Sequence, residues 1–310
     1  MYISQPYQTT LSKSVSRSGI GLHSARLVDL SIRPAPADTG IVFRRTDVTN
    51  VDTNIPAISS NIADTMLNSQ IMNDDGVGIG TIEHLMAAFA GLGVDNAYVD
   101  VSAAELPAMD GSAEPYCAMI NEAGIELLNV SRKYLKVIKT VSVQSEQSTA
   151  SISPAQKLEI DITIDFGDPL IGKSQYFYVQ NDLSFEQELA AARTFCLYRD
   201  LTKMRAVGYA LGGSLDNAIV VDDGKLMNET PLRYTDEFVR HKTLDCIGDL
   251  SLAGLPVLGH ISAERPGHAV NNMLLEALLA DESAWVVVDA LELEDESQDA
   301  TMAEPAAAYA

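Results

Sequence analysis

The amino-acid sequence predicts an α+β fold of two similar domains, each a β-sheet layered with α-helices on one side. Three observations lead to this prediction. The chain has 310 residues, 46% of them hydrophobic and 21% charged, a composition typical of a globular protein with one large or two medium domains. Strand-like alternation and helix-like periodicity both occur in each half of the chain. The two kinds of pattern do not alternate regularly enough for a parallel sheet built from βαβ units.

The first half carries the patterns of two strands and two helices. Residues 28–32 and 96–101 alternate between apolar and polar side chains, as half-buried strands do. Between them, residues 81–89 have the periodicity of a helix, with Thr81 as the expected N-cap and Gly91 as the expected stop. A turn over 107–115 is then expected to lead into a helix over 116–122.

The second half opens with a new run of strands. Its clearest pattern is the strict alternation of residues 158–166, which predicts a strand with one buried and one solvated face. The other expected elements are strands over 135–137 and 141–143, helices over 185–193 and 236–252, and a closing buried strand over 286–288. We place the boundary between the halves near residues 129–133. The expected domains are 1–130 and 131–295, followed by an acidic, alanine-rich tail over 296–310.

The charge of the chain excludes several classes of partner. Its 43 acidic and 21 basic residues give a formal net charge of −22. Such a protein repels a phosphate backbone and adsorbs poorly to anionic lipid as a whole, so we expect no binding to nucleic acid. Three scattered cysteines indicate reduced thiols rather than a disulfide framework. The sequence shows neither a secretory signal nor a run of about 20 apolar residues, so we expect a cytoplasmic protein without a transmembrane segment.

The predicted helix over 236–252 carries a row of polar groups on one face. His241, Asp245 and Asp249 are spaced four residues apart, which stacks them one helical turn above another. Apolar residues fill many of the other positions. Such a row is either a solvated stripe or a metal site, and this helix alone does not decide between the two.

A second group, Glu83 and His84, begins the first predicted helix. A ligand histidine beside a glutamate base is the arrangement of HExxH metalloproteases, although a lone Glu-His pair is more often an ordinary helix start. Two histidines and one aspartate suit a catalytic zinc ion, because three protein ligands leave a position open for water. From their local sequence, the remaining histidines His23, His260 and His268 are expected to be exposed in loops.

Seven short segments form a recognisable set in their order and separations. They are Thr81–Leu85, Glu105–Ala113, Ala192–Phe195, Leu211–Ser214, Ala218–Val220, Asp236–Lys242 and Gly267–Ala269. Together they resemble the UDP-3-O-acyl-N-acetylglucosamine deacetylases, which are zinc enzymes of lipid A assembly in Gram-negative bacteria. The resemblance extends over nearly the whole chain, from about residue 11 to residue 290.

The resemblance implies a two-domain fold with the active site in the cleft between the domains. It implies that His84, His241 and Asp245 bind one catalytic zinc ion per chain, with iron(II) as an alternative ion in the cell. Glu83 is then the base that activates water. A zinc site resolves the ambiguity of the polar row in favour of a metal.

The other site residues also follow from the resemblance. His268 is implied as the cationic partner of the base, with the Asp249 carboxylate beside it. Whether Glu83 or His268 delivers the final proton to the leaving amine stays open. Thr194 and Lys242 are expected to line the oxyanion side. The residues expected to contact substrate are Phe195 and Lys242, with Phe166 and Arg265 near the nucleotide, and residues 195–225 are expected to form an inserted βαβ element that shapes an acyl-chain passage.

The implied substrate is a small UDP-linked acylated amino sugar, whose N-acetyl group is hydrolysed in the committed step of lipid A biosynthesis. We expect a monomer. Two other functions compete: a zinc amidase for a different acylated sugar, and an inactive protein that binds a lipid or a nucleotide sugar. An inactive protein is expected to lack Glu83 or a metal ligand, and all are present. Ala25 stands where the family usually has glycine, and Asn68–Ser69 lies in a segment that often differs, so the loop geometry there stays open.

Overall fold

The computed structural model describes residues 6–181 and 183–292, and the tail expected over 296–310 lies outside this range. The predicted α+β class is confirmed. Helices and strands are mixed along the chain, and most strand pairs are antiparallel.

The described elements are as follows. The strands are β1 (Tyr7–Leu11), β2 (Val15–Ile20), β3 (Leu27–Pro34), β4 (Ile41–Arg45), β5 (Asn54–Pro56), β6 (Ile62–Asp64), β7 (Gln70–Met72), β8 (Gly78–Ile79), β9 (Ala97–Val101), β10 (Ile125–Ser131), β11 (Lys133–Val137), β12 (Val141–Gln144), β13 (Thr149–Ser153), β14 (Leu158–Asp165), β15 (Lys173–Val179), β16 (Phe195–Leu197), β17 (Ile219–Asp222), β18 (Lys225–Leu226), β19 (Val257–Glu264) and β20 (Trp285–Asp289). The helices are α1 (Glu83–Leu92), α2 (Glu114–Ala123), α3 (Tyr198–Ala206), α4 (Glu237–Leu250) and α5 (His268–Ala280), with short helical turns η1 (Ser59–Asn61), η2 (Phe185–Leu189) and η3 (Ser251–Ala253).

Two sheets carry most of the fold. The first half of the chain forms a five-stranded sheet in the order β2-β3-β9-β4-β5. The second half forms a seven-stranded sheet, in which β12, β13, β19, β11 and β20 follow one another and β14 and β15 extend from β19. Strands β3 and β14 bury every second side chain, as their alternating sequences predicted.

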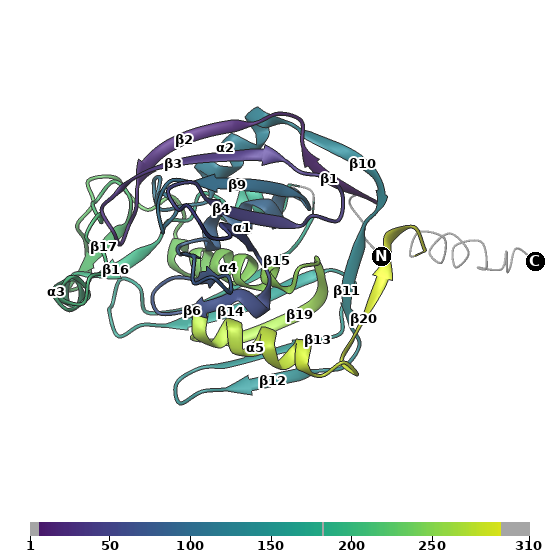
Figure 1. The fold of residues 1–310 in the computed structure, drawn as a ribbon. Coiled ribbons are helices and arrows are strands. Elements are labelled where there is room, and N and C mark those ends of the chain that lie inside the picture. Colours follow the sequence, from purple (N-terminus) through teal and green to yellow (C-terminus); the bar gives the residue numbers. More distant parts are fainter. Residues whose placement is uncertain (1–5, 182, 293–310) are drawn as a thin grey trace, which may run out of the picture.

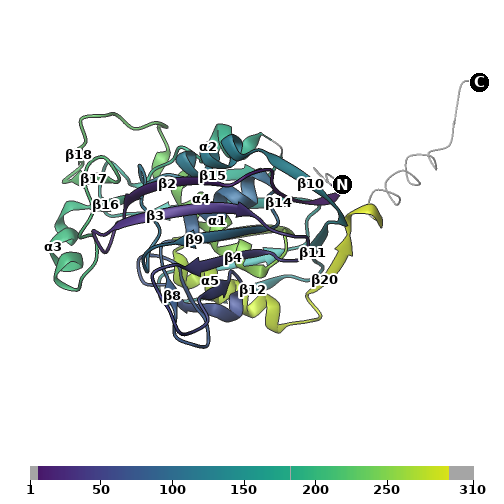
Figure 2. The same cartoon turned by 45° about the horizontal axis from the view of Figure 1, so that its top comes forward.

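Helices α1 and α4 lie between the two sheets (Figure 1). In Figure 2, the sheet of the first half lies across both helices. Eight of the ten α1 residues and twelve of the fourteen α4 residues are buried. A helix buried on nearly every side has no solvated face, so its polar side chains must find partners within the protein.

The two central helices approach each other closely at Gly248. A Cβ atom at this position would lie 2.1 Å from the Glu83 carbonyl oxygen and 2.8 Å from its carbonyl carbon. Only glycine therefore allows the backbone of α4 to pass the first turn of α1 at this distance. The contact sets the separation of the polar residues on the two helices.

A smaller unit extends from one side of the molecule. Strands β16 and β17 pair in parallel with α3 as their connection, and β18 adds an antiparallel strand. In Figures 1 and 2, α3 lies at the far edge of the molecule, next to the ends of β2 and β3. Nothing covers its outer side among the described residues, and none of the α3 residues is fully buried.

The start of α1 differs from the prediction. The helix begins at Glu83, and Thr81, with a φ of 57°, makes no capping hydrogen bond. Its hydroxyl accepts a hydrogen bond from Asn68 Nδ2 at 3.0 Å and donates to Glu105 Oε1 at 3.3 Å. Thr81 is buried, so tertiary partners satisfy its hydroxyl in place of the helix end.

The end of α1 also differs from the prediction. Gly91 lies inside the helix, where a side chain would collide with the ring of Phe185: a Cβ atom there would be 2.2 Å from that ring. The helix instead ends at Gly93, which adopts a left-handed φ of 72°.

The helix expected over 185–193 forms only as the five-residue turn η2. The chain then straightens, because the Arg193 amide donates to Glu237 Oε1 and the Thr194 amide donates to the Gly111 carbonyl. The strand expected over 286–288 is present within β20, but it is not buried. Val286 and Val287 are 39% and 48% exposed, since β20 lies at the edge of its sheet and pairs only with β11.

We predict that Gly248→Ala destabilises the protein by about 1–3 kcal/mol, because the new methyl group overlaps the Glu83 backbone. Helix propensity alone would favour alanine by about 1 kcal/mol, so the sign of the effect is diagnostic. Urea unfolding provides the measurement. Gly167→Ala is the control, since a Cβ atom at Gly167 meets no atom within 4 Å. Unchanged or increased stability of Gly248→Ala would contradict the close contact.

Candidate metal centre and its cavity

A cavity of about 530 Å³ lies between the start of α1, the middle of α4 and the βαβ unit. Its lining residues form two groups. The polar group contains Glu83, His84, His241, Asp245 and His268. The apolar group comes mainly from β16, α3 and β17 and includes Phe195, Tyr198, Leu201, Met204 and Val220.

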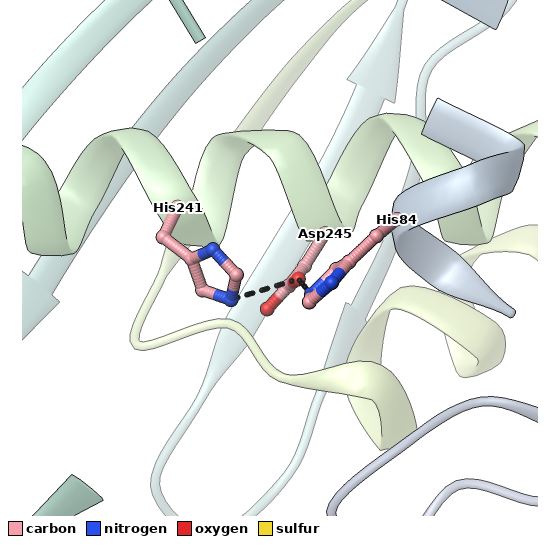
Figure 3. A group of neighbouring side chains, drawn as sticks. All are labelled: His84, His241 and Asp245. Atoms are coloured by element: carbon pink, nitrogen blue, oxygen red, sulfur yellow. Dashed lines mark ion pairs between the residues drawn. The ribbon is translucent and has the colours of Figure 1, made fainter. Parts of the chain in front are cut away.

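His84, His241 and Asp245 converge at the polar end (Figure 3). His84 comes from α1, and the other two come from successive turns of α4. Asp245 Oδ1 lies 3.3 Å from His241 Nε2 and 3.6 Å from His84 Nε2. One possible ligand atom from each residue lies within 4.8 Å of the other two, so a single ion can contact all three.

The chemistry of these three groups fits a cation. Asp245 Oδ1 is buried and has no hydrogen-bond partner, a costly state for a carboxylate oxygen unless a cation binds it. His241 Nδ1 lies 3.0 Å from the Ala192 carbonyl oxygen, and donating to it leaves Nε2 with its lone pair. Burial lowers the pKa of His241 to about 3, so the imidazole is neutral. The three side chains of the polar row on α4, His241, Asp245 and Asp249, are all buried, so the row is not a solvated stripe.

A second polar pair, His268 and Asp249, lies beside the triad. His268 Nδ1 is 2.9 Å from Asp249 Oδ2, and His268 Nε2 is 3.9 Å from Glu83 Oε1. Burial works against protonation of His268, but the charge and hydrogen bond of Asp249 outweigh it and raise the pKa of His268 to about 9. The prediction that His268 is an exposed loop histidine is therefore wrong, whereas the implied pairing with Asp249 is present in the structure.

Two further residues that the sequence did not indicate hold this pair. The Ser69 hydroxyl donates to Asp249 Oδ1, and the Ser69 amide donates to Glu83 Oε2 at 3.1 Å. Asn271 Nδ2 donates to Asp249 Oδ2 at 2.8 Å. Asn271 could have been found, because it follows His268 by three residues on the same helix face. Ser69 carries no such spacing signal.

Thr194, Phe195 and Lys242 also line the cavity. Lys242 Nζ lies 2.7 Å from Asp245 Oδ2, so the lysine pairs with the oxygen that the triad does not use. The Phe195 ring packs edge-on against the rings of Phe238 and Phe166. Lys242 and Phe195 thus stand where the polar and apolar groups of the lining meet.

Phe166 and Arg265 are not brought to the cavity, since neither belongs to its lining. Phe166 lies behind Phe195, with ring centroids 5.3 Å apart. The Arg265 side chain is about half exposed and pairs with Asp165 Oδ2 at 2.9 Å. Any contact of these two residues with a ligand would therefore be made outside the cavity.

His23 is a further residue that the sequence placed wrongly. Instead of lying exposed in a loop, it is buried and lines the cavity. Its Nδ1 accepts the Ala210 amide at 3.2 Å, which leaves Nε2 buried without a hydrogen-bond partner. Glu105 holds the turn by accepting the amides of His23 and Ser24. In the same turn Ala25 adopts a φ of 56°, a conformation that glycine reaches without strain.

Comparison with known proteins agrees with this geometry. A protein-family model described as UDP-3-O-acyl N-acetylglycosamine deacetylase matches residues 8–280. The chain belongs to this deacetylase family. Curated relatives from Pasteurella multocida, Histophilus somni and Hahella chejuensis, each named UDP-3-O-acyl-N-acetylglucosamine deacetylase, are 45%, 45% and 46% identical to it over 283 residues. The matches cover 91% of this chain and 92%, 92% and 93% of the relatives.

Membership of the deacetylase family confirms the resemblance inferred from the sequence and identifies the chain as an enzyme. The family is one of metalloenzymes, and the buried triad is a possible metal-binding group within this chain. Among the described helices, none is long and apolar enough to cross a bilayer.

We predict that the purified protein binds about one divalent metal ion per chain and that His241→Ala loses it, because two remaining ligands hold such an ion poorly. Metal content by mass spectrometry provides the measurement. The matched control is His260→Ala, since His260 lies on strand β19, not in an exposed loop as the sequence predicted, and pairs with Glu159. Full metal content in His241→Ala would contradict the ligand assignment.

Proposed function

We propose that the protein is a zinc metalloamidase that hydrolyses the N-acetyl group of UDP-3-O-acyl-N-acetylglucosamine, giving the free amine and acetate. This is the committed step of lipid A biosynthesis. The observation that carries the proposal is the unpartnered, buried Asp245 Oδ1 beside two histidine nitrogens at the polar end of an otherwise apolar cavity. The names of the curated relatives supply the substrate class.

The proposed ligands of the ion are His84, His241 and Asp245. Zinc suits this set of two nitrogens and one carboxylate oxygen, and iron(II) is the alternative in the cell. When bound, such an ion supplies Lewis-acid chemistry, which acidifies water and polarises a carbonyl oxygen.

In this proposal Glu83 accepts the proton of the attacking water. It precedes the ligand His84, and burial raises its pKa, which makes its carboxylate more basic. Its Oε2 accepts the Ser69 amide, so this carboxylate is held in one orientation. His268, protonated through its pairing with Asp249, stabilises the negative charge that develops on the carbonyl oxygen and can protonate the leaving amine.

Thr194 and Lys242 would complete the oxyanion side. Both line the cavity. Two hydrogen bonds fix the Thr194 backbone: its amide donates to the Gly111 carbonyl, and its carbonyl accepts from the Ile219 amide. Backbone anchoring of this kind holds a catalytic side chain in position before substrate arrives.

The apolar part of the cavity would hold the acyl chain. On β16 and β17, Cys196 and Val220 line the cavity, whereas Leu197, Ile219 and Val221 belong to the hydrophobic core. The two strands therefore present one set of side chains to the cavity as an apolar wall and pack the other set into the core. We place the nucleotide near Phe166 and Arg265, outside the cavity, because the resemblance to the family implies these positions.

We further propose a cytoplasmic monomer whose two domains divide close to Arg132, between β10 and β11. The absence of a membrane-spanning helix among the described residues is compatible with this location. The division would leave His84 in the first domain and His241 with Asp245 in the second, so the proposed site lies between the domains.

We predict that Asp249→Asn moves the basic limb of the pH profile of kcat/KM to lower pH. The folded pKa of His268, about 9, lies above the ordinary histidine value of 6.5 because Asp249 stabilises the protonated form. Protonated His268 is therefore lost only as the pH rises through about 9, and loss of the aspartate charge lowers this limit. Ser69→Ala is the control, since it removes a hydrogen bond but keeps the charge, and its limb should stay near that of the wild type. If the basic limb of the Asp249→Asn profile stayed at the wild-type pH, His268 would not be the group whose protonation sets that limb.

The proposed activity is tested by measuring acetate release from UDP-3-O-acyl-N-acetylglucosamine. We expect turnover that requires the metal, and a fall of kcat/KM by orders of magnitude when the acyl chain is removed, since each buried methylene contributes up to about 0.8 kcal/mol. Val220→Asp should impair the acylated substrate and leave the deacylated one nearly unchanged. Equal kcat/KM for the two substrates would point to a different acylated sugar, and absence of turnover in the metal-loaded protein would refute the amidase.

A further inference from the structure

The outer surface of the βαβ unit combines exposed apolar and basic side chains. Four large apolar residues are at least half exposed there: Leu27 at 67%, Tyr198 at 50%, Val207 at 68% and Leu211 at 50%. Soluble proteins seldom gather large exposed apolar side chains at one place unless something binds them. We call this group, together with the basic residues described next, the rim.

The basic residues of the rim are Arg26, Arg199 and Lys203, all exposed. None of these three forms an ion pair with any residue in 6–181 or 183–292. Arg199 and Lys203 are four residues apart, so they lie on the same side of α3. Helix α3 carries Arg199, Lys203 and Arg205 against one carboxylate, Asp200, on a protein whose net charge is −22.

The two chain segments that form the rim are joined by hydrogen bonds. The amide of Leu211 donates to the His23 carbonyl at 3.2 Å, and the amide of Gly212 donates to the Leu22 carbonyl at 3.0 Å. The turn between β2 and β3 is therefore held against the segment that follows α3. Figures 1 and 2 show α3 and this turn together at one extremity of the molecule.

The rim lies beside the apolar end of the cavity. On α3, Leu201 and Met204 line the cavity, while Arg199 and Lys203 occupy other helical positions that do not. Tyr198 both lines the cavity and is half exposed, so the cavity reaches the surface beside the rim. An apolar chain that leaves the cavity here would pass directly between the exposed apolar and basic residues.

We propose that the rim is a docking surface for the headgroup layer of an anionic lipid bilayer, from which the acyl chain of the substrate enters the cavity. Apolar side chains would insert at the boundary between headgroups and chains, and the cations would contact anionic headgroups. Charge complementarity favours this partner, because the net charge of the chain repels an anionic surface, whereas α3 carries three cations and one carboxylate. The route of the acyl chain rests on the proposed function, but the docking itself does not.

Vesicle sedimentation with the full chain, without substrate, tests the docking. The vesicles contain phosphatidylcholine alone or with a third of phosphatidylglycerol. We expect binding to the anionic vesicles at low salt and weaker binding at about 0.5 M salt, where charge interactions reach only about 4 Å. Arg199→Glu with Lys203→Glu should weaken this binding at least about twenty-five-fold, since each cation near an anionic surface contributes about five-fold.

The matched control is Lys13→Glu with Lys173→Glu, which makes the same charge change at two exposed lysines outside the rim. The control should bind nearly as the wild type does, apart from the small effect of net charge. A second variant, Val207→Ser with Leu211→Ser, should weaken binding without any change of charge. Circular dichroism verifies that the folds are intact, which is expected because all these side chains are exposed.

Equal loss of binding in the rim and control variants would overturn the proposal, because the total charge of the protein, rather than the rim, would then determine its binding to anionic vesicles. Absence of wild-type binding to anionic vesicles, or equal binding to neutral ones, would overturn it as well. Acetate release from a soluble, short-chain substrate separates this result from the proposed function. The Arg199→Glu/Lys203→Glu variant should keep the wild-type rate on that substrate and lose rate only on substrate embedded in vesicles.

Discussion

The close approach of α1 and α4 at Gly248 is the constraint on which the site depends. The two helices belong to different halves of the chain, and each is buried on nearly every side. Since the α4 backbone passes directly against the Glu83 carbonyl, His84 comes within reach of the Asp245 and His241 side chains. A side chain at this glycine would collide with the Glu83 backbone and push apart the two helices that carry the three groups.

Around this contact, the structure fixes each reactive group through a backbone atom or a buried partner. The Ala192 carbonyl sets the tautomer of His241, and the Ser69 amide holds Glu83 while its hydroxyl holds Asp249. One loop residue thus connects the proposed base with the carboxylate that raises the pKa of His268. Orientation before substrate binding is what electrostatic catalysis requires, because no reorganisation is then needed during the reaction.

The sequence predicted the α+β class, the central helices and six strands (β3, β9, β11, β12, β14 and β20), because those depend on local periodicity. It also predicted the row of His241, Asp245 and Asp249, since spacing along one helix is a local property. Spacing did not decide between a solvated stripe and a metal site; the family motifs did, and burial in the structure agrees. The errors have a common physical cause. The roles of Thr81, Gly91 and His23 are determined by residues distant in sequence, such as Glu105 and Phe185, and no local pattern contains those contacts.

The proposed ligands come from both halves of the chain, so an ion bound by all three would bridge the halves. A chain cut between β10 and β11 would leave His84 on one fragment and His241 with Asp245 on the other, so neither fragment alone would hold all three ligands. Two separately produced fragments would regain the triad only after α1 had packed on α4 at Gly248. Metal uptake by such a split protein would therefore report reassembly of the helix pair, and the affinity between the fragments would increase with the concentration of free ion.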